Sequence, residues 1–187
     1  ADELILSTDD TTLGGPLGVT GATFTFECWF RTNSSDLQYL ICRNSSQQYG
    51  GLSITPSASQ IAWGGNVTGT TLVAEGVTIN TGTWYHVAVV VSGSQAVAIY
   101  LNGLEVASTT WTEWGYGTPS DNITIGSQHY TNGLHRYVFD GHIDEVRWSN
   151  IARYTADFSS SLPESFFVND SNTKLLIQSN FTVASEP

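Results

Sequence analysis

The stretch GHIDEVRWSNIARYTADF, from Gly141 to Phe158, follows two others that predict strands: GTWYHVAVVV (residues 82–91) and VAIYLNGLEVAS (residues 97–108). In YHVAVVV both alternating sets of side chains are apolar, which is typical of a strand that is covered on both faces. The second stretch turns at Asn102 and Gly103, the pair best suited to a two-residue primed hairpin. Together they predict a central strand of a packed sheet followed by a tight antiparallel hairpin.

These three stretches, in this order, resemble the laminin-G-like domains of the concanavalin A-like lectin/glucanase superfamily. In that family a Gly-Thr-Trp-Tyr-His-Val strand, a hairpin closing on Asn-Gly and a Gly-x-Ile-Asp-Glu-Val-Arg strand recur. The matching positions are Gly82 to Val87, Asn102 with Gly103, and Gly141 to Arg147. The continuation after Arg147 is similar in style to versions of the domain in phage and viral tail and surface proteins. The resemblance covers nearly the whole chain, and it implies a fold more specifically than an activity.

The rest of the chain supports an all-β fold. Short strand candidates alternate with Gly, Ser, Asn and Thr, and only the segment 150–158 suggests a helical turn. Many short strands with turn signals between them favour a sandwich or jelly roll. We therefore predict a two-sheet antiparallel β-sandwich of the concanavalin A-like, jelly-roll type. A chain of 187 residues with 40% hydrophobic residues fits a single domain over residues 1–187.

Charge and hydropathy exclude several partners. The chain has 17 acidic and 6 basic residues, a formal net charge of -11, so it should repel phosphate backbones and not bind nucleic acid. The longest apolar run, Val87 to Val91, has the length of a strand, which argues against insertion into a membrane. We expect an extracellular or virion-surface location, with oligomerisation as part of a larger assembly left open.

The sequence predicts no enzymatic activity. Glucanases of the resembling superfamily carry their two carboxylates in a Glu-x-Asp-x-x-Glu pattern, which this chain lacks. The nearest pair, Asp144 and Glu145, is adjacent and would point to opposite faces of a regular strand. Metalloprotease, nucleophile-elbow and phosphate-loop motifs are absent as well.

Aromatic residues in two loops indicate sugar binding. Sugars present apolar C–H faces and hydroxyl edges, so lectin sites combine an aromatic platform with nearby polar side chains. Two loops flank the strand Ile123 to Gly126 and should emerge at its opposite ends. The candidate residues are Trp111, Trp114, Tyr116, Asp121 and Asn122 in the first, preferred loop, and His129, Tyr130 and Arg136 in the second.

The alternative for Trp111 and Trp114 is that they cap the core. Trp29, Trp84 and Trp148 belong to strand motifs, and we expect them in the core.

A glycan array and a sizing column would separate the two functions that remain. One is a non-catalytic, lectin-like adhesion module of a viral or cell-surface attachment protein. The other is a structural or protein-interaction jelly roll without a sugar site.

Two further features leave alternatives open. Asp9, Asp10 and Asp144 could supply hard oxygen ligands to a structural calcium, or could be solvated surface carboxylates. A hairpin centred on Ser35 would set Cys28 opposite Cys42. That pair could then form a disulfide or remain two buried thiols.

Overall fold

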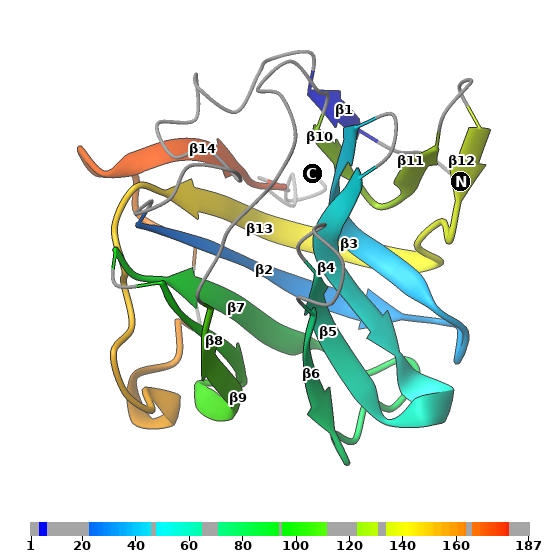
Figure 1. Ribbon diagram of the computed structural model, residues 1–187, viewed down its shortest axis with the longest axis horizontal. Coiled ribbons are helices and arrows are strands. Elements are labelled where there is room, and N and C mark those ends of the chain that lie inside the picture. Colours follow the sequence, from blue (N-terminus) through cyan, green and yellow to red (C-terminus); the bar gives the residue numbers. More distant parts are fainter. Residues whose placement is uncertain are drawn as a thin grey trace, which may run out of the picture.

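The structure is a computed structural model of the 187-residue chain. It describes residues 4–6, 23–45, 48–64, 71–93, 95–111, 123–130, 134–163 and 166–179. The predicted all-β fold is confirmed, because two antiparallel sheets form a sandwich (Figure 1). The helices of the described part are two short 3-10 turns, Pro56–Ala58 and Ser159–Ser161, and no helix there is long and apolar enough to cross a bilayer.

Each main sheet has six strands. The first sheet runs in the order β1 (Leu4–Leu6), β10 (Ile123–Ile125), β3 (Gln38–Ser45), β4 (Gln48–Thr55), β5 (Gln60–Gly64) and β6 (Thr71–Glu75). The second sheet runs in the order β14 (Thr173–Ile177), β13 (Gly141–Ser149), β2 (Phe24–Thr32), β7 (Tyr85–Val91), β8 (Ala96–Leu101) and β9 (Leu104–Thr110). A small separate hairpin joins β11 (Gln128–Tyr130) to β12 (Leu134–Arg136).

The core lies between the two sheets and follows the alternation of the strands. In β2 the inward set is Phe24, Phe26, Cys28 and Phe30, all fully buried. Phe24 stacks on Trp148 of β13 with 4.9 Å between ring centroids, and it also contacts Trp63 of β5 in the opposite sheet. Strand β7 is buried along its whole length, as its doubly apolar sequence predicted.

The β8–β9 hairpin turns where the sequence predicted. Asn102 and Gly103 both have positive φ angles, 49° and 78°, as a type I′ turn requires. Gly103 has a second reason to be glycine, because a Cβ there would come within 2.5 Å of the backbone nitrogen of Ser159. The turn is therefore docked against the segment that follows β13.

The predicted hairpin between Cys28 and Cys42 is wrong. Strand β2 pairs with β7 and β13, whereas β3 pairs with β4 and β10 in the other sheet. The turn after β2 therefore carries the chain across the sandwich instead of reversing it within one sheet. Both cysteines are buried free thiols in different sheets. Alternation places a residue on a face but does not identify the partner strand.

The segment after β13 folds over the outer face of the second sheet. It contains no helical turn over residues 150–158, contrary to the prediction, and the short 3-10 turn comes just after them. Phe158 joins a small second core with Ala88, Val90 and Tyr100 on that face. Its backbone nitrogen also donates to the carbonyl oxygen of Gly103 at 2.7 Å. Contacts with the second sheet, instead of hydrogen bonds within a helical turn, therefore hold residues 150–158 in place.

Candidate functional site

The outer face of the second sheet carries polar and aromatic side chains in rows across neighbouring strands. Because Arg31 pairs with His142 in the register of β2 and β13, these two side chains lie side by side. Trp84 directly precedes β7 and lies next to Arg31. We call these three residues the Trp84 row. Among the described residues, the segment after β13 packs on rows further along the strands, at Ala88, Val90 and Tyr100, whereas Trp84 stays exposed.

The geometry of the Trp84 row joins an exposed ring to hydrogen-bond donors. The Trp84 side chain is 41% exposed. The Arg31 guanidinium carbon lies 5.6 Å from the centroid of the Trp84 ring, within the range of a cation–π contact. Arg31 Nη2 lies 3.2 Å from His142 Nδ1, and the His142 and Trp84 rings are 6.3 Å apart. The three side chains thus form one surface.

A buried ionic network lies on the same outer face, further along β2, where the segment after β13 covers it. Glu27, two positions before Trp29 on β2, is fully buried and accepts hydrogen bonds from Arg147 Nε at 2.8 Å and His86 Nε2 at 3.1 Å. The Tyr154 hydroxyl donates to the same carboxylate at 2.7 Å. These contacts fix the outer face of β2, β7 and β13 to the segment after β13, which we call the covering segment.

The charges in this network shift two pKa values. Burial alone would raise the pKa of Glu27, but the hydrogen bond from His86 and the positive charge of Arg147 outweigh it, so its pKa lies below the ordinary 4.5. Burial, and then the charge of Glu27, raise the pKa of the Tyr154 hydroxyl. Glu27 is therefore a charged structural group, closed to any ligand.

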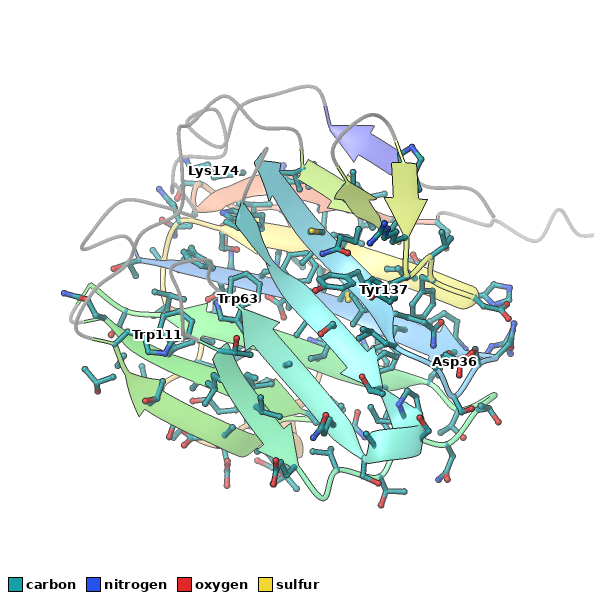
Figure 2. The ribbon with its side chains drawn as sticks, turned by 45° about the vertical axis from the view of Figure 1, so that its right-hand side comes forward. Asp36, Trp63, Trp111, Tyr137 and Lys174 are labelled. Carbon is teal, nitrogen blue, oxygen red and sulfur yellow. The ribbon has the colours of Figure 1, made fainter. Side chains whose placement is uncertain are left out.

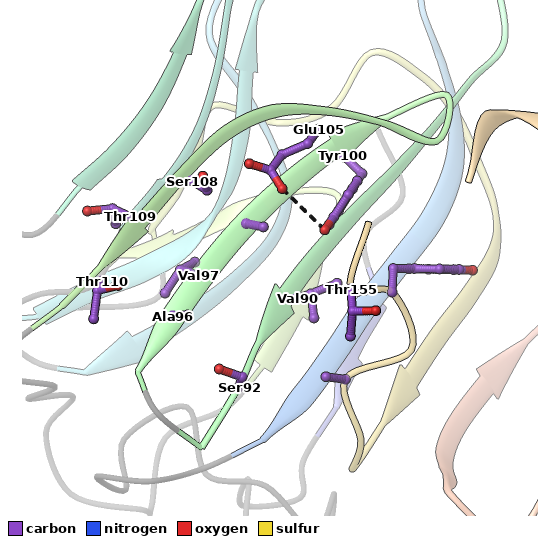
Figure 3. A pocket seen from close by; sticks show the side chains of 13 residues that line it. Val90, Ser92, Ala96, Val97, Tyr100, Glu105, Ser108, Thr109, Thr110 and Thr155 are labelled. Carbon is purple, nitrogen blue, oxygen red and sulfur yellow. Dashed lines mark hydrogen bonds between the residues drawn. The ribbon is translucent and has the colours of Figure 1, made fainter. Parts of the chain in front are cut away.

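A groove of about 420 Å³ lies elsewhere on the same face (Figure 3). Strands β7, β8 and β9 form its floor and the segment 152–155 borders it. In this groove the Tyr100 hydroxyl donates to Glu105 Oε2 at 3.4 Å, and hydroxyls of Ser and Thr residues line the rim. Burial, and then the charge of Glu105, raise the pKa of Tyr100 to about 12.

The groove is the larger hollow, but it lacks an open aromatic face. Tyr100 is only 2% exposed, and Tyr154 stacks on Phe158 with 3.6 Å between ring centroids. The Trp84 row instead presents an exposed indole that a flat apolar sugar face can cover. We therefore take the Trp84 row as the candidate site.

The first predicted sugar-binding loop falls mostly outside the described residues: Trp114, Tyr116, Asp121 and Asn122 are not among them. Trp111 is described and is only 8% exposed, as part of the main core cluster (Figure 2). It is thus a core residue and not the exposed platform that we expected. The alternation of β9 continues to Trp111 and carries it inward between the sheets.

The second predicted loop is described in part. His129 and Tyr130 belong to β11, but their side chains lie outside the described part of the chain. Arg136 ends β12 and is exposed. The next residue, Tyr137, is half exposed with its ring centroid 6.1 Å from that of Tyr39 (Figure 2). This pair belongs to the first sheet's side of the molecule, apart from the Trp84 row.

Asp144, one of the three candidate calcium ligands, makes hydrogen bonds within the fold. Its Oδ1 accepts from the backbone N–H of Glu145 at 2.7 Å and of Ser179 at 3.0 Å, and its Oδ2 accepts from the Ser179 hydroxyl. No group of three or more His, Cys, Asp or Glu side chains within the described ranges could hold a metal ion. Asp9 and Asp10 lie outside those ranges, so calcium binding there stays a prediction.

Glu145 is also engaged within the fold. A bulge between Asp144 and Arg147 interrupts the strand alternation that we had assumed, and Glu145 has a positive φ of 52°. Its Oε2 accepts from the backbone N–H of Phe167 at 2.7 Å and from Gln178 Nε2 at 2.8 Å. Glu145 therefore anchors the covering segment to β13.

Sequence reasoning missed Trp84, which we had expected in the core. One signal was available. Alternation from Tyr85, Val87 and Val89 puts Trp84 on the opposite face, together with His86 and Ala88. That the covering segment stops short of Trp84 could not be read from the pattern.

Comparisons with known proteins identify the family and the fold. Residues 7–157 match the family described as the concanavalin A-like lectin/glucanases superfamily. No curated protein matches the chain in sequence.

Solved structures with a similar fold come from several organisms. A candidate carbohydrate-binding protein of Bacteroides ovatus is 20% identical with a TM-score of 0.66, and the match covers 95% of this chain and 49% of that one. This chain thus spans about half the length of that protein. The heptameric SAP-like pentraxin of Limulus polyphemus is 18% identical with a TM-score of 0.58, over 95% of this chain and 89% of that one.

A third structure is CBM40 of the Ruminococcus gnavus IT-sialidase, which is 16% identical with a TM-score of 0.65 over 82% of this chain and 92% of that one. At these identities the solved structures show a shared fold and not a shared ligand. The family match, in contrast, spans most of the sequence, including the strand motifs described above. The chain belongs to the concanavalin A-like lectin/glucanases superfamily.

Proposed function

We propose that the chain is a non-catalytic carbohydrate-recognition module whose glycan lies on the Trp84 row. The observation that carries this proposal is the exposed indole of Trp84, with Arg31 and His142 beside it. The ring can stack on the C–H face of a pyranose while the donors reach its hydroxyl oxygens. Because Arg31 and His142 lie on paired strands of a sheet, little ordering would be needed on binding.

Two kinds of observation support this class of function. The similar folds include carbohydrate-binding modules, and CBM40 of the Ruminococcus gnavus enzyme has been solved with α2,3-sialyllactose bound. On the outer face itself, the carboxylates of Glu27 and Asp144 are engaged in hydrogen bonds within the fold. That engagement favours binding without hydrolysis of the glycosidic bond.

The biological setting belongs to the same proposal. We infer that the module forms part of a larger extracellular or viral attachment protein that recognises host-surface glycans. The style of the sequence after Arg147 and the acidic composition support this setting. Assembly into an oligomer would add avidity to a weak single site.

Replacing Trp84 tests the proposed site. Trp84→Ala should weaken binding to the glycan selected on an array by about 10-fold to 100-fold, or about 1–3 kcal/mol, because the stacking surface is lost. Titration calorimetry measures this. Leu104→Ala is the matched control, since it removes another exposed apolar side chain at the β8–β9 turn. No glycan bound by the unmodified chain, or equal losses in both variants, would argue against the proposal.

A second candidate function is a protein-interaction domain. It is favoured by Phe166 and Val168, which are 57% and 75% exposed and flank the buried Phe167. A contiguous exposed apolar patch is typical of a protein-contact surface, and these two side chains could belong to one. Under this reading the array shows no glycan, and sedimentation shows an assembly that dissociates when both residues are changed to Ser. A monomeric chain that binds glycan would exclude it.

A further inference from the structure

Arg31 contacts a histidine and a tryptophan, and neither of these partners is a carboxylate. Its Nη2 donates to His142 Nδ1 at 3.2 Å, and its guanidinium faces the Trp84 ring. Its Nε is buried and makes no hydrogen bond among the described residues. A guanidinium carries five N–H donors and no acceptor, so a ligand at this place would have to meet the Nη groups of Arg31, since Nε is buried.

The other arginines of the sheet's outer face are paired with carboxylates. Arg147 binds Glu27 at 2.7 Å, and Arg153 binds Asp170 at 2.9 Å. Within the described part of the chain, no carboxylate lies within ion-pair distance of Arg31. The protein has 17 acidic and 6 basic residues, so carboxylates are plentiful. Arg31 nevertheless contacts an imidazole and an indole instead of a carboxylate. Its natural counterpart is an external acceptor with negative charge.

His142 adds a second donor at the same place. Because an arginine can only donate, Nδ1 of His142 must accept the hydrogen bond from Arg31. In the neutral ring the proton then lies on Nε2, at an exposed side chain. The row therefore presents the Arg31 fork, an imidazole N–H and the Trp84 ring to one ligand.

We infer that the Trp84 row selects sugars that carry a carboxylate, which would bind the Arg31 guanidinium while the ring stacks on Trp84. This inference rests on the proposed function and names its ligand class. The planar fork of arginine matches both oxygens of a carboxylate, which a neutral hydroxyl cannot do. The net charge of -11 argues against polyanions, so an isolated acidic residue on a glycan fits better than a sulfated polymer.

The test compares acidic sugars with neutral partners of the same shape. Titration calorimetry would use α2,3-sialyllactose, its methyl ester and lactose, and likewise methyl β-glucuronide with methyl β-glucoside. The first set tests a sialic acid and the second a hexuronic acid. We expect at least one acid to bind about tenfold or more tightly than its neutral partner.

Variants of Arg31 tie this preference to the row. Arg31→Gln should remove the preference for the acid, and Arg31→Lys should restore part of it, because lysine keeps the charge but not the fork. Lys174→Gln is the control, since it removes one positive charge from β14, at the other end of the molecule from the turn with Asp36 that follows β2 (Figure 2). Melting temperatures of all variants establish that they are folded.

The outcomes separate the inference from the proposed function. Acid and ester bound equally, or an acid preference that survives Arg31→Gln, would overturn the inference. The same holds if neutral glycans from the array bind in a Trp84-dependent way while no acid does, although the lectin function would then stand. Equal losses in Arg31→Gln and Lys174→Gln would reduce the effect to net charge and also overturn it. If no sugar binds at all, both the inference and the proposed function fail.

Discussion

At the scale of single residues, two tryptophans near strand ends have opposite environments. Trp111 follows β9 and packs in the main core, whereas Trp84 precedes β7 and remains 41% exposed. Both are large aromatic residues next to threonine, so residue type and immediate neighbours do not distinguish them. Two factors decide whether such a residue is buried or exposed. One is the face of the sheet on which it lies, and the other is whether another segment covers that face.

This difference predicts different costs for the same truncation. Trp111→Ala should lower the free energy of unfolding by about 3–5 kcal/mol, because it leaves a cavity in the core. Trp84→Ala should change it by less than about 1 kcal/mol. Urea denaturation followed by fluorescence or circular dichroism measures both. A loss at Trp84 as large as that at Trp111 would mean that Trp84 supports the fold instead of a ligand.

At the scale of elements, β2 joins the core to the ionic network. Its inward residues are apolar, and on its outward face Glu27 is held by groups from β7, β13 and the covering segment. A buried carboxylate without such partners would be strongly destabilising. The network therefore makes the docking of the covering segment a condition for stable folding.

The pKa of Glu27 gives this element a pH dependence. Because its pKa is lowered on folding, the charged form stabilises the native state fully above pH 4.5, and this contribution is lost as the pH falls through the folded value. The fall in stability at acid pH is called the acid limb, and Glu27→Gln should make it less steep. At neutral pH it should also cost about 3–5 kcal/mol, because Arg147 would keep its charge without a buried partner.

Thermal unfolding from pH 7 down to pH 2 measures the limb. Asp36→Asn is the control, since it removes one carboxylate from an exposed turn at the end of β2 (Figure 2). An acid limb that is unchanged in Glu27→Gln would assign acid sensitivity to other groups, of which Asp170 is one. Its hydrogen bond from Arg153 holds its pKa well below the usual range.

At the scale of the whole molecule, the two thiols lie in different layers, because Cys28 belongs to the core between the sheets and Cys42 does not. Cys28 in β2 and Cys42 in β3 are fully buried, one in each sheet. Burial, and then the charge of Glu27, raise the pKa of the Cys28 thiol, so it resists forming the reactive thiolate. The Cys28 thiol therefore reports on the core between the sheets, and the Cys42 thiol reports on the covered outer side of the first sheet.

We expect neither thiol to react with a thiol reagent at pH 8 in the native state. Both should react when the chain unfolds, over the same denaturant range as the loss of circular dichroism. Counting modified thiols by mass spectrometry across a urea series measures this. One thiol that reacts well before global unfolding would show that its layer opens independently of the other layer.

Sequence alone determined the features that depend on neighbouring residues. The doubly apolar run in β7 and the Asn102–Gly103 turn each fix a local geometry, and both were predicted. Together with the family resemblance they were enough to predict a two-sheet sandwich. They succeed because backbone sterics and side-chain period act over a few residues.

Only the tertiary structure decided how distant segments meet. Glu27 and Arg147 are 120 positions apart, and the crossing of the chain after β2 separates Cys28 from Cys42, which the sequence had placed in one hairpin. The Trp84 row exists because Arg31 and His142 are paired across β2 and β13, Trp84 before β7 lies beside Arg31, and the described part of the segment after β13 leaves Trp84 exposed. Strand alternation assigns each side chain to a face, but burial and partner choice depend on long-range packing that no local period encodes.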